Sequence, residues 1–485
     1  MNWPTDPRAP LTGYASTAKF LFWAAVLLLT AVAYANYSGN GLIFLSFSFI
    51  SNGLLYSGFR RNAIFFDAFI GVLCWLGFWL KVAVRVAFFD GKFIEATGYF
   101  DGSAAAFDQA LIVASCGLAG FWVSSILRER IFPGYAQQNA PQQLEGLSSF
   151  YLKHRRAVLV SFVALFLIVG FTNAYWGIYQ RGSITRTTLP FGLNGVYTWL
   201  LLFGFSSISA LILRFEFDSR KQAPYLALFL GLLESFASNV SIMSRGMILN
   251  SSALLLGAFA SFNFHSMRAK ARFFSIGIGA LLLLFASSVL TVNYLRSQVY
   301  LDSPQETQSE QGSRRSLLAT EQMTNRLFLD RWVGIEGVMA ASSYPGLGWD
   351  LWRSAWHETY NENETSFYDQ KLITSPYVKT DKSKHHFVSL PGIVAFFYYT
   401  GSLPFLFIGM LCLGWLASGV EVATYRLGGG NLILCALLSQ VVAFRFTSFG
   451  YVPKQSYLLF GTIALNVAII FLADKVIRRH FNAKK

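Results

Sequence analysis

The chain has 485 residues, of which 54% are hydrophobic and 17% aromatic, while only 13% are charged. Soluble proteins usually carry about 25% charged residues, so this composition excludes an ordinary soluble globular protein. The formal net charge is +14. No nucleic-acid partner is needed to explain it, because much of the positive charge lies in short segments between apolar stretches.

Apolar stretches of about 20 residues recur along the chain, and each could cross roughly 30 Å of hydrocarbon as a helix. The alternation typical of membrane β-strands is absent, so we predict an all-α polytopic integral membrane protein. Nine spans are expected in the first part, at 17–36, 41–58, 63–89, 104–127, 157–177, 196–214, 224–243, 247–264 and 273–292. After a long polar stretch, apolar segments follow at 388–400, 403–421, 431–449 and 456–475.

Basic residues cluster in alternate connections between these spans, which places those connections and the N-terminus in the cytoplasm. The clusters contain Arg60, Arg61, Arg128, Arg130, Lys153, Arg155, Arg156, Arg214, Arg220, Lys221, Arg268, Lys270 and Arg272. The segment 388–400 has only about 13 residues. A half-helix there gives twelve crossings and a cytoplasmic basic tail, whereas a full crossing gives thirteen. The predicted regions are an N-terminal bundle of about nine helices (1–292), a large, partly helical outer loop (293–387), and C-terminal helices with the tail (388–485).

Several cations lie where the positive-inside rule does not place them. Arg181 and Arg186 occupy one short outer connection, and Arg245 occupies another between two apolar spans. Either they extend to lipid headgroups or their planar guanidinium groups bind a phosphate or pyrophosphate. Arg445 lies inside a span, where an arginine by default marks a site or a buried partner. Lys81 and Arg85, one helical turn apart, line a common face or simply lie near the outer end of their span.

The long loop contains the remaining candidates. Arg326 and Arg331 are further cations, and Glu336 is either an ion-pair partner of a nearby basic residue or a catalytic group. His385 and His386 precede an apolar segment, where a histidine either caps a helix or acts as a general base, since its side chain titrates near neutral pH. No cluster of residues has the spacing of metal ligands, so neither a metal nor another cofactor is predicted.

Three short patterns resemble those of the Wzy-type polymerases of lipid-linked oligosaccharide repeat units, relatives of the O-antigen ligases. Ten residues separate Arg181 from Gly192, and ten separate Arg326 from Gly337, similar to the Arg-x10-Gly spacing in two periplasmic loops of this family. Ser244-Arg245-Gly246 is similar to a Ser-Arg-Gly junction between spans. His386-Phe387-x-x-Leu390 resembles the family's His-Asn-x-x-Leu, with Phe387 in place of asparagine.

The resemblance implies an inverting glycosyltransferase of the bacterial inner membrane, with the long loop in the periplasm. Its substrates would be undecaprenyl-pyrophosphate-linked glycans, used without nucleotide sugar or metal, for O-antigen or exopolysaccharide synthesis. A chain-length-regulating co-polymerase would be a further partner.

Such a reaction needs cations where charge grows on the departing pyrophosphate. The candidate pyrophosphate-binding residues are Arg181, Arg186, Arg245, Arg326, Arg331 and Arg445. The first candidate for the base is His386, followed by Glu336 and His385. The alternatives are an O-antigen ligase, which transfers the glycan to lipid A-core, and a flippase or exporter of lipid-linked oligosaccharide. Loop size and the paired spacings favour the polymerase, and the lack of a visible internal repeat disfavours a transporter.

Overall fold

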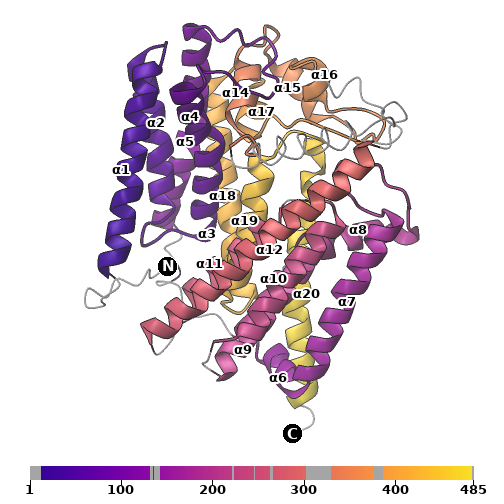
Figure 1. Ribbon diagram of the computed structural model, residues 1–485. Helices are drawn as coiled ribbons and strands as arrows, with labels where there is room; N and C mark the ends of the chain where they lie inside the picture. Colours follow the sequence, from indigo (N-terminus) through magenta and orange to yellow (C-terminus); the bar gives the residue numbers. More distant parts are fainter. Residues whose placement is uncertain are drawn as a thin grey trace, which may run out of the picture.

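The computed structural model describes residues 12–131, 135, 143–220, 223–244, 246–262, 266–301, 329–375 and 386–482. Within these ranges the regular structure is helical, so the predicted all-α fold is confirmed for this part of the chain (Figure 1). The N-terminal part contains α1 (Thr12–Asn36), α2 (Gly41–Ser57), α3 (Phe65–Cys74), α4 (Lys81–Phe88), α5 (Ala104–Ile131), α6 (Glu145–Lys153), α7 (Arg155–Trp176), α8 (Leu193–Trp199), α9 (Phe205–Arg220), α10 (Tyr225–Ser241), α11 (Met247–Ser261) and α12 (Met267–Leu301). The remainder contains α14 (Ile335–Ser342), α15 (Trp349–Trp356), α16 (Phe367–Lys371), α17 (Ile393–Tyr398), α18 (Leu403–Leu427), α19 (Leu432–Thr447) and α20 (Ser456–Asn482).

Two of the membrane helices contain a short π-helical turn. The turn Trp75–Leu80 joins α3 to α4, and the turn Leu200–Gly204 joins α8 to α9. Each composite helix therefore continues across its π-helical turn, from Phe65 to Phe88 in the first case and from Leu193 to Arg220 in the second. The insertion of one residue in a π-helical turn is a feature often found near functional sites.

Eight described helices are long and apolar enough to cross a membrane, namely Thr17–Asn36, Phe65–Phe88, Ala104–Ile131, Arg155–Trp176, Pro190–Ser219, Arg268–Arg296, Leu403–Leu427 and Pro453–His480. Four shorter apolar helices, Gly41–Ser57, Tyr225–Ser241, Met247–Ser261 and Leu432–Thr447, pack among them. Large apolar side chains cover the outside of this bundle; on α1, for example, Phe20 and Leu28 are exposed. An apolar exterior of this kind is suited to lipid rather than water.

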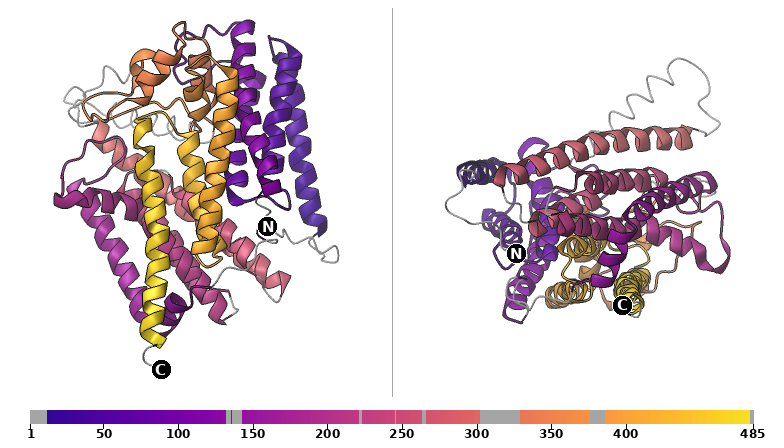
Figure 2. Two further views of the ribbon diagram at one scale, coloured as in Figure 1. Left: turned by 180° about the vertical axis from the view of Figure 1, so that it is seen from behind. Right: turned by 90° about the horizontal axis from the view of Figure 1, so that it is seen from below.

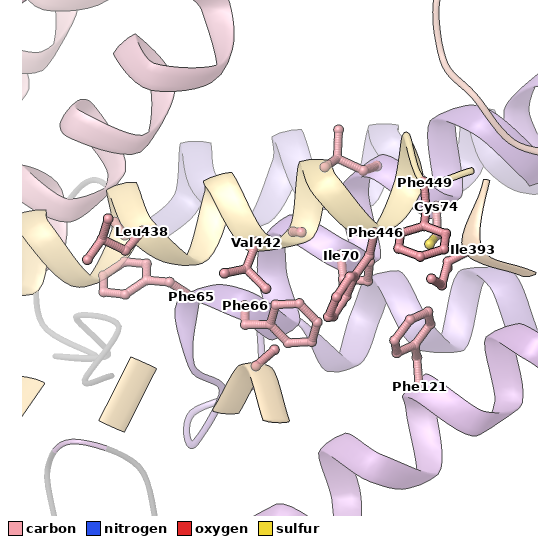
Figure 3. Packing of buried hydrophobic residues seen from close by; sticks show 14 of the residues in the cluster. Phe65, Phe66, Ile70, Cys74, Phe121, Ile393, Leu438, Val442, Phe446 and Phe449 are labelled. Carbon is pink, nitrogen blue, oxygen red and sulfur yellow. The ribbon is translucent and has the colours of Figure 1, made fainter. Parts of the chain in front are cut away.

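Helix α19 occupies the centre of the bundle, between α3 and α11. Asn431 caps its first turn by accepting hydrogen bonds from the amides of Ile433 and Leu434. Figure 3 shows side chains of α3 and α19 meeting with a phenylalanine of α5 in this core. Phe66, Phe121 and Phe446 are buried there, with ring centroids 5.9–6.4 Å apart. The dense aromatic packing fixes α19, and with it the position of Arg445 near its end.

The short helices α14 to α17 gather at one end of the bundle, here termed the loop side (Figures 1 and 2). The N-terminal end of α1 and the C-terminal end of α20 lie toward the opposite end of the bundle in the same views. Helix α6 lies close to the C-terminal end of α20. The expectation of helix within 293–387 is thus met by α14, α15 and α16. Helix α12 extends to Leu301, beyond the end predicted at residue 292.

The apolar segment after the long loop contains less helix than its sequence predicts. Residues 386–392 have no regular structure, and α17 covers only Ile393–Tyr398. Pro391 lacks an amide hydrogen and disfavours helical geometry at the residue before it, and Gly392 adopts a φ of +80°. His386 is therefore not at the start of a helix, as the sequence suggested, but seven residues before one.

Candidate functional site

A cavity of about 440 Å³ on the loop side brings together residues from distant parts of the sequence. We call it the arginine cavity. Its lining contains two charged residues among those the structure describes, Arg181 and Arg445. The full lining is Tyr179, Arg181, Leu201, Leu202, Phe203, Asn239, Ile242, Ser244, Gly246, Leu249, Asn250, Tyr360, Gln440, Val441, Phe444, Arg445, Ser448, Tyr451, Val452, Gln455, Leu458 and Leu459. Its volume lies within the range of about 300–1,000 Å³ that is common for small-ligand sites.

Arg445 projects from the last turn of α19. Its Nε and Nη2 donate to the hydroxyl of Ser456, at 3.2 and 2.9 Å, and the guanidinium carbon lies 5.4 Å from the ring centroid of Phe449. In the described chain no carboxylate forms an ion pair with it. Among the described residues, a hydroxyl and an aromatic ring hold this half-buried guanidinium, and its positive charge is one that an anionic ligand can neutralise.

Arg181 enters the cavity from the connection between α7 and α8. Its Nη1 lies 3.4 Å from the hydroxyl of Ser244, and its amide donates to the carbonyl of Ile242 at 3.0 Å. Asn173 anchors this connection, because its side chain bonds both the amide and the carbonyl of Tyr179. No carboxylate is paired with Arg181 in the part of the chain that the structure describes. Two cations separated by 264 positions in the sequence thus line one cavity.

The Ser244-Arg245-Gly246 junction borders the same cavity. Ser244 and Gly246 both line it, and the hydroxyl of Ser244 accepts from the amide of Gly246 at 3.1 Å. Arg245 itself lies outside the described residues, as do Arg326 and His385.

His386 lies behind two tyrosines of the cavity wall. Its ring centroid is 5.8 Å from that of Tyr360 and 5.3 Å from that of Tyr451. Its Nδ1 is 3.0 Å from the carbonyl oxygen of Glu362, which can only accept, so Nδ1 carries the hydrogen. In the neutral ring the lone pair is then on Nε2, a buried atom with no hydrogen-bond partner among the described residues. His386 itself is absent from the cavity lining.

Glu336 belongs to a different site. Lys81 of α4 binds both of its carboxylate oxygens, at 2.8 and 3.0 Å, and also the carbonyl of Trp332 at 2.6 Å. One turn further along α4, Arg85 pairs with Asp330 at 2.6 Å. All four charged side chains are buried. The partner expected for Glu336 is thus Lys81, and the two cations of α4 fasten the segment 330–336 to the bundle.

Burial raises the pKa of Glu336 above its ordinary value of 4.5, and Lys81 lowers it in part. This carboxyl faces a second cavity, of about 540 Å³, which we call the mixed-charge cavity. Its lining comprises Lys81, Ile94, Glu95, Ala96, Asp330, Arg331, Trp332, Val333, Gly334, Glu336, Gly337, Tyr368, Ile373, Ser375, Val388, Ser389 and Leu390. Arg331 therefore lies with Glu336 and away from Arg181 and Arg445.

Arg186 lies in neither lining. Its side chain is exposed, and its aliphatic carbons cover Gly177 at the end of α7. The predicted group of arginines is therefore divided. Arg181 and Arg445 share one cavity, Arg331 lines the other, and Arg186 is on the surface.

The glycines of the two Arg-x10-Gly spacings have conformational and packing roles. Gly192 adopts a φ of +72°, a left-handed conformation that strongly favours glycine. At Gly337, in α14, an added Cβ would overlap the carbonyl of Pro391. The first glycine allows the chain to turn before α8, and the second allows α14 to pack directly against the segment that follows His386.

Sequence reasoning missed Tyr360 and Tyr451, which wall the arginine cavity, and Glu95, which borders the mixed-charge cavity. It also missed Glu358, whose carboxylate accepts from the amides of Phe367 and Val452 at 2.7 and 3.2 Å. Burial raises the pKa of Glu358, and these two amides lower it in part. No local pattern distinguishes these residues, since each contact joins segments far apart in the sequence.

The fold and its apolar surface define a multi-pass helical membrane protein, and its described residues form the arginine cavity and the mixed-charge cavity. Comparison with known proteins adds no closer assignment: no family model, no curated protein and no solved structure matches the chain.

Proposed function

We propose that this protein is a membrane glycosyltransferase that joins undecaprenyl-pyrophosphate-linked oligosaccharide repeat units at the outer face of the bacterial inner membrane. The observation that carries the proposal is the convergence of Arg181 and Arg445, without ion-pair partners in the described chain, in one cavity beside the Ser244–Gly246 junction. The short sequence patterns described above add the family resemblance to Wzy-type polymerases.

Two guanidinium groups are suited to the departing group of this reaction. The acceptor hydroxyl oxygen forms a bond to the anomeric carbon while the bond from that carbon to the pyrophosphate oxygen breaks. The pyrophosphate leaves with the electron pair, and the hydroxyl proton passes to a base, for which His386, in contact with the tyrosines of the cavity wall, remains our first candidate. Cations that contact the growing negative charge stabilise the transition state more than the ground state.

An adjacent apolar groove supports a lipid-linked substrate. A cavity of about 680 Å³ extends along α18 and α20 and is lined mainly by apolar side chains, among them Leu413, Phe446 and Phe460. Ser456 borders this groove and also bonds Arg445. A molecule with a diphosphate head and a long isoprenoid tail would therefore place its charge at Arg445 and its tail against α18 and α20.

The proposal includes a topology. We infer that the eight long apolar helices and the four shorter ones make twelve crossings, with α17 as a short helix that does not cross. The loop side is then periplasmic, and the basic tail is cytoplasmic, in agreement with the positive-inside rule. A co-polymerase that regulates chain length remains a proposed further partner.

The test is chain growth by the purified protein in liposomes supplied with lipid-linked repeat units. The proposal expects a ladder of longer glycans, which Arg181→Ala and Arg445→Ala abolish, while Arg353→Ala retains it because Arg353 is an exposed arginine of α15. Transfer only onto lipid A-core would instead support a ligase. Translocation without chain growth would support an exporter and overturn the proposal.

A further inference from the structure

The mixed-charge cavity differs from the arginine cavity in its charge. Its described lining contains three carboxylates, of Glu95, Asp330 and Glu336, and two cations, Lys81 and Arg331. A pyrophosphate would approach three negative groups there, so this cavity is poorly suited to the anionic part of the substrate. Carboxylates and ammonium groups beside each other instead supply strong hydrogen-bond acceptors and donors to an uncharged polar ligand.

The cavity is held in shape by contacts that leave little freedom. Gly334 packs directly on the backbone of Gly77, and Gly337 packs on the carbonyl of Pro391, with no room for a Cβ at either glycine. The Lys81–Glu336 and Arg85–Asp330 pairs fix the same segment by charge. A site formed before the ligand arrives avoids the cost of ordering its side chains on binding.

One extended segment separates the two cavities. Val388, Ser389 and Leu390 line the mixed-charge cavity, while His386, two residues earlier, contacts the tyrosines of the arginine cavity. The amide of Ser389 donates to Asp369 at 2.8 Å, which fixes the segment to α16. A substrate that extended from one cavity to the other would pass this segment near His386.

We propose that the mixed-charge cavity binds an uncharged oligosaccharide, the glycan portion of a repeat unit. The inference rests on the proposed function, which requires a glycan to be held beside a lipid diphosphate. Sugar hydroxyls both donate and accept hydrogen bonds, so they match a lining that contains both carboxylates and cations. Trp332 and Tyr368 add aromatic surface. The volume of about 540 Å³ is large enough for a ligand of several rings.

Equilibrium binding tests this inference without any turnover. The probe is the free oligosaccharide released by mild acid from the lipid-linked pool of the source cell and freed of phosphate, measured by saturation-transfer NMR with the full-length protein in nanodiscs. Glu95→Gln removes an exposed carboxylate at the cavity, and Ala96→Trp fills the space. Each is expected to weaken binding roughly tenfold or more, because a hydrogen bond to a charged group or the space itself is lost.

Matched controls separate this site from the other. Asp350→Asn removes a fully exposed carboxylate of α15 and is expected to bind the probe as the wild type does. Arg181→Ala and Arg445→Ala are also expected to retain binding, and inorganic pyrophosphate should not compete. Binding that is unchanged by both Glu95→Gln and Ala96→Trp, or that pyrophosphate displaces, would overturn the inference.

The two proposals fail differently. If chains grow but glycan binding is unchanged by Glu95→Gln and Ala96→Trp, the glycosyltransferase proposal stands. The proposed glycan site is then wrong. If Glu95→Gln weakens glycan binding but the protein never extends chains, the glycan site stands and the glycosyltransferase proposal is wrong.

Discussion

Nζ of Lys81 lies 2.8 Å from Oε1 of Glu336, and both side chains are buried between a membrane helix and the segment on the loop side. The two residues are 255 positions apart, so this ion pair fastens the long loop to the N-terminal half of the bundle. Removing one partner of a buried pair leaves an uncompensated charge, which typically costs about 3–5 kcal/mol.

Lys81→Met should therefore lower the unfolding temperature in detergent, whereas the double variant Lys81→Met/Glu336→Leu should regain most of the loss, since no charge then stays buried alone. Arg353→Met is the control, because the side chain of Arg353 is largely exposed. Its ion pair with the exposed Asp350 is long, at 4.0 Å. Equal unfolding temperatures for Lys81→Met and the control would contradict this account.

Gly337→Ala should destabilise the protein by roughly 1–3 kcal/mol, because a Cβ has no space against the carbonyl of Pro391. Gly348→Ala is the matched control on the same side, since no atom lies within 4 Å of its Cβ position and its backbone is extended. Chemical unfolding followed by tryptophan fluorescence compares the two. A control as unstable as Gly337→Ala would mean that the contact with Pro391 does not explain the loss, since alanine favours a helix more than glycine does.

Arg445→Ala should reduce the initial rate of chain growth by about 10²–10³-fold, the usual effect of removing one preorganised donor to a developing anion. Arg445→Lys should retain part of the activity, because it keeps the charge but loses the planar pair of donors. Arg245→Ala should also slow chain growth, since the sequence places this cation on the outer side against the positive-inside rule. Rates are measured in proteoliposomes with equal amounts of protein, and full activity in both alanine variants would remove the pyrophosphate site.

His386→Ala should slow chain growth if this side chain is the base. The reason is that Nδ1 is bound to the carbonyl of Glu362, so a neutral ring can accept a proton only at Nε2. His386→Gln tests geometry separately, since its amide can still bond the same carbonyl without titrating. A wild-type rate of chain growth in His386→Ala would assign the base elsewhere, with Glu336 next in order.

The carboxyl of Glu358 should make stability depend on pH. Burial raises its pKa above the ordinary 4.5, so between 4.5 and that raised value the folded protein binds more protons than the unfolded chain. The free energy of unfolding then falls as pH rises through this interval. Below the interval, the contribution of Glu358 no longer changes with pH. Glu358→Gln cannot titrate, so the difference in unfolding temperature between wild type and variant should change across the interval. A constant difference would show that Glu358 has the same pKa in both states.

The amino-acid pattern alone was sufficient to predict the helical class and the main apolar segments. Runs of about 20 apolar residues can satisfy their backbone in lipid only as helices, so α1, α5, α7 and α18 follow directly from composition. The prediction from hydropathy was wrong at 388–400. It indicated a longer helix there, and Pro391 with Gly392 prevents one.

Only the tertiary structure decided which charges meet. The sequence singled out Arg181 and Arg445 as cations out of place, but it equally singled out Arg186, which is exposed, and Arg331, which faces the other cavity. It offered Glu336 as a catalytic group or an ion-pair partner, and the fold pairs it with Lys81. Side-chain periodicity reports which face of a helix is apolar, whereas the partner of a buried charge depends on how distant helices pack, and that information is not local.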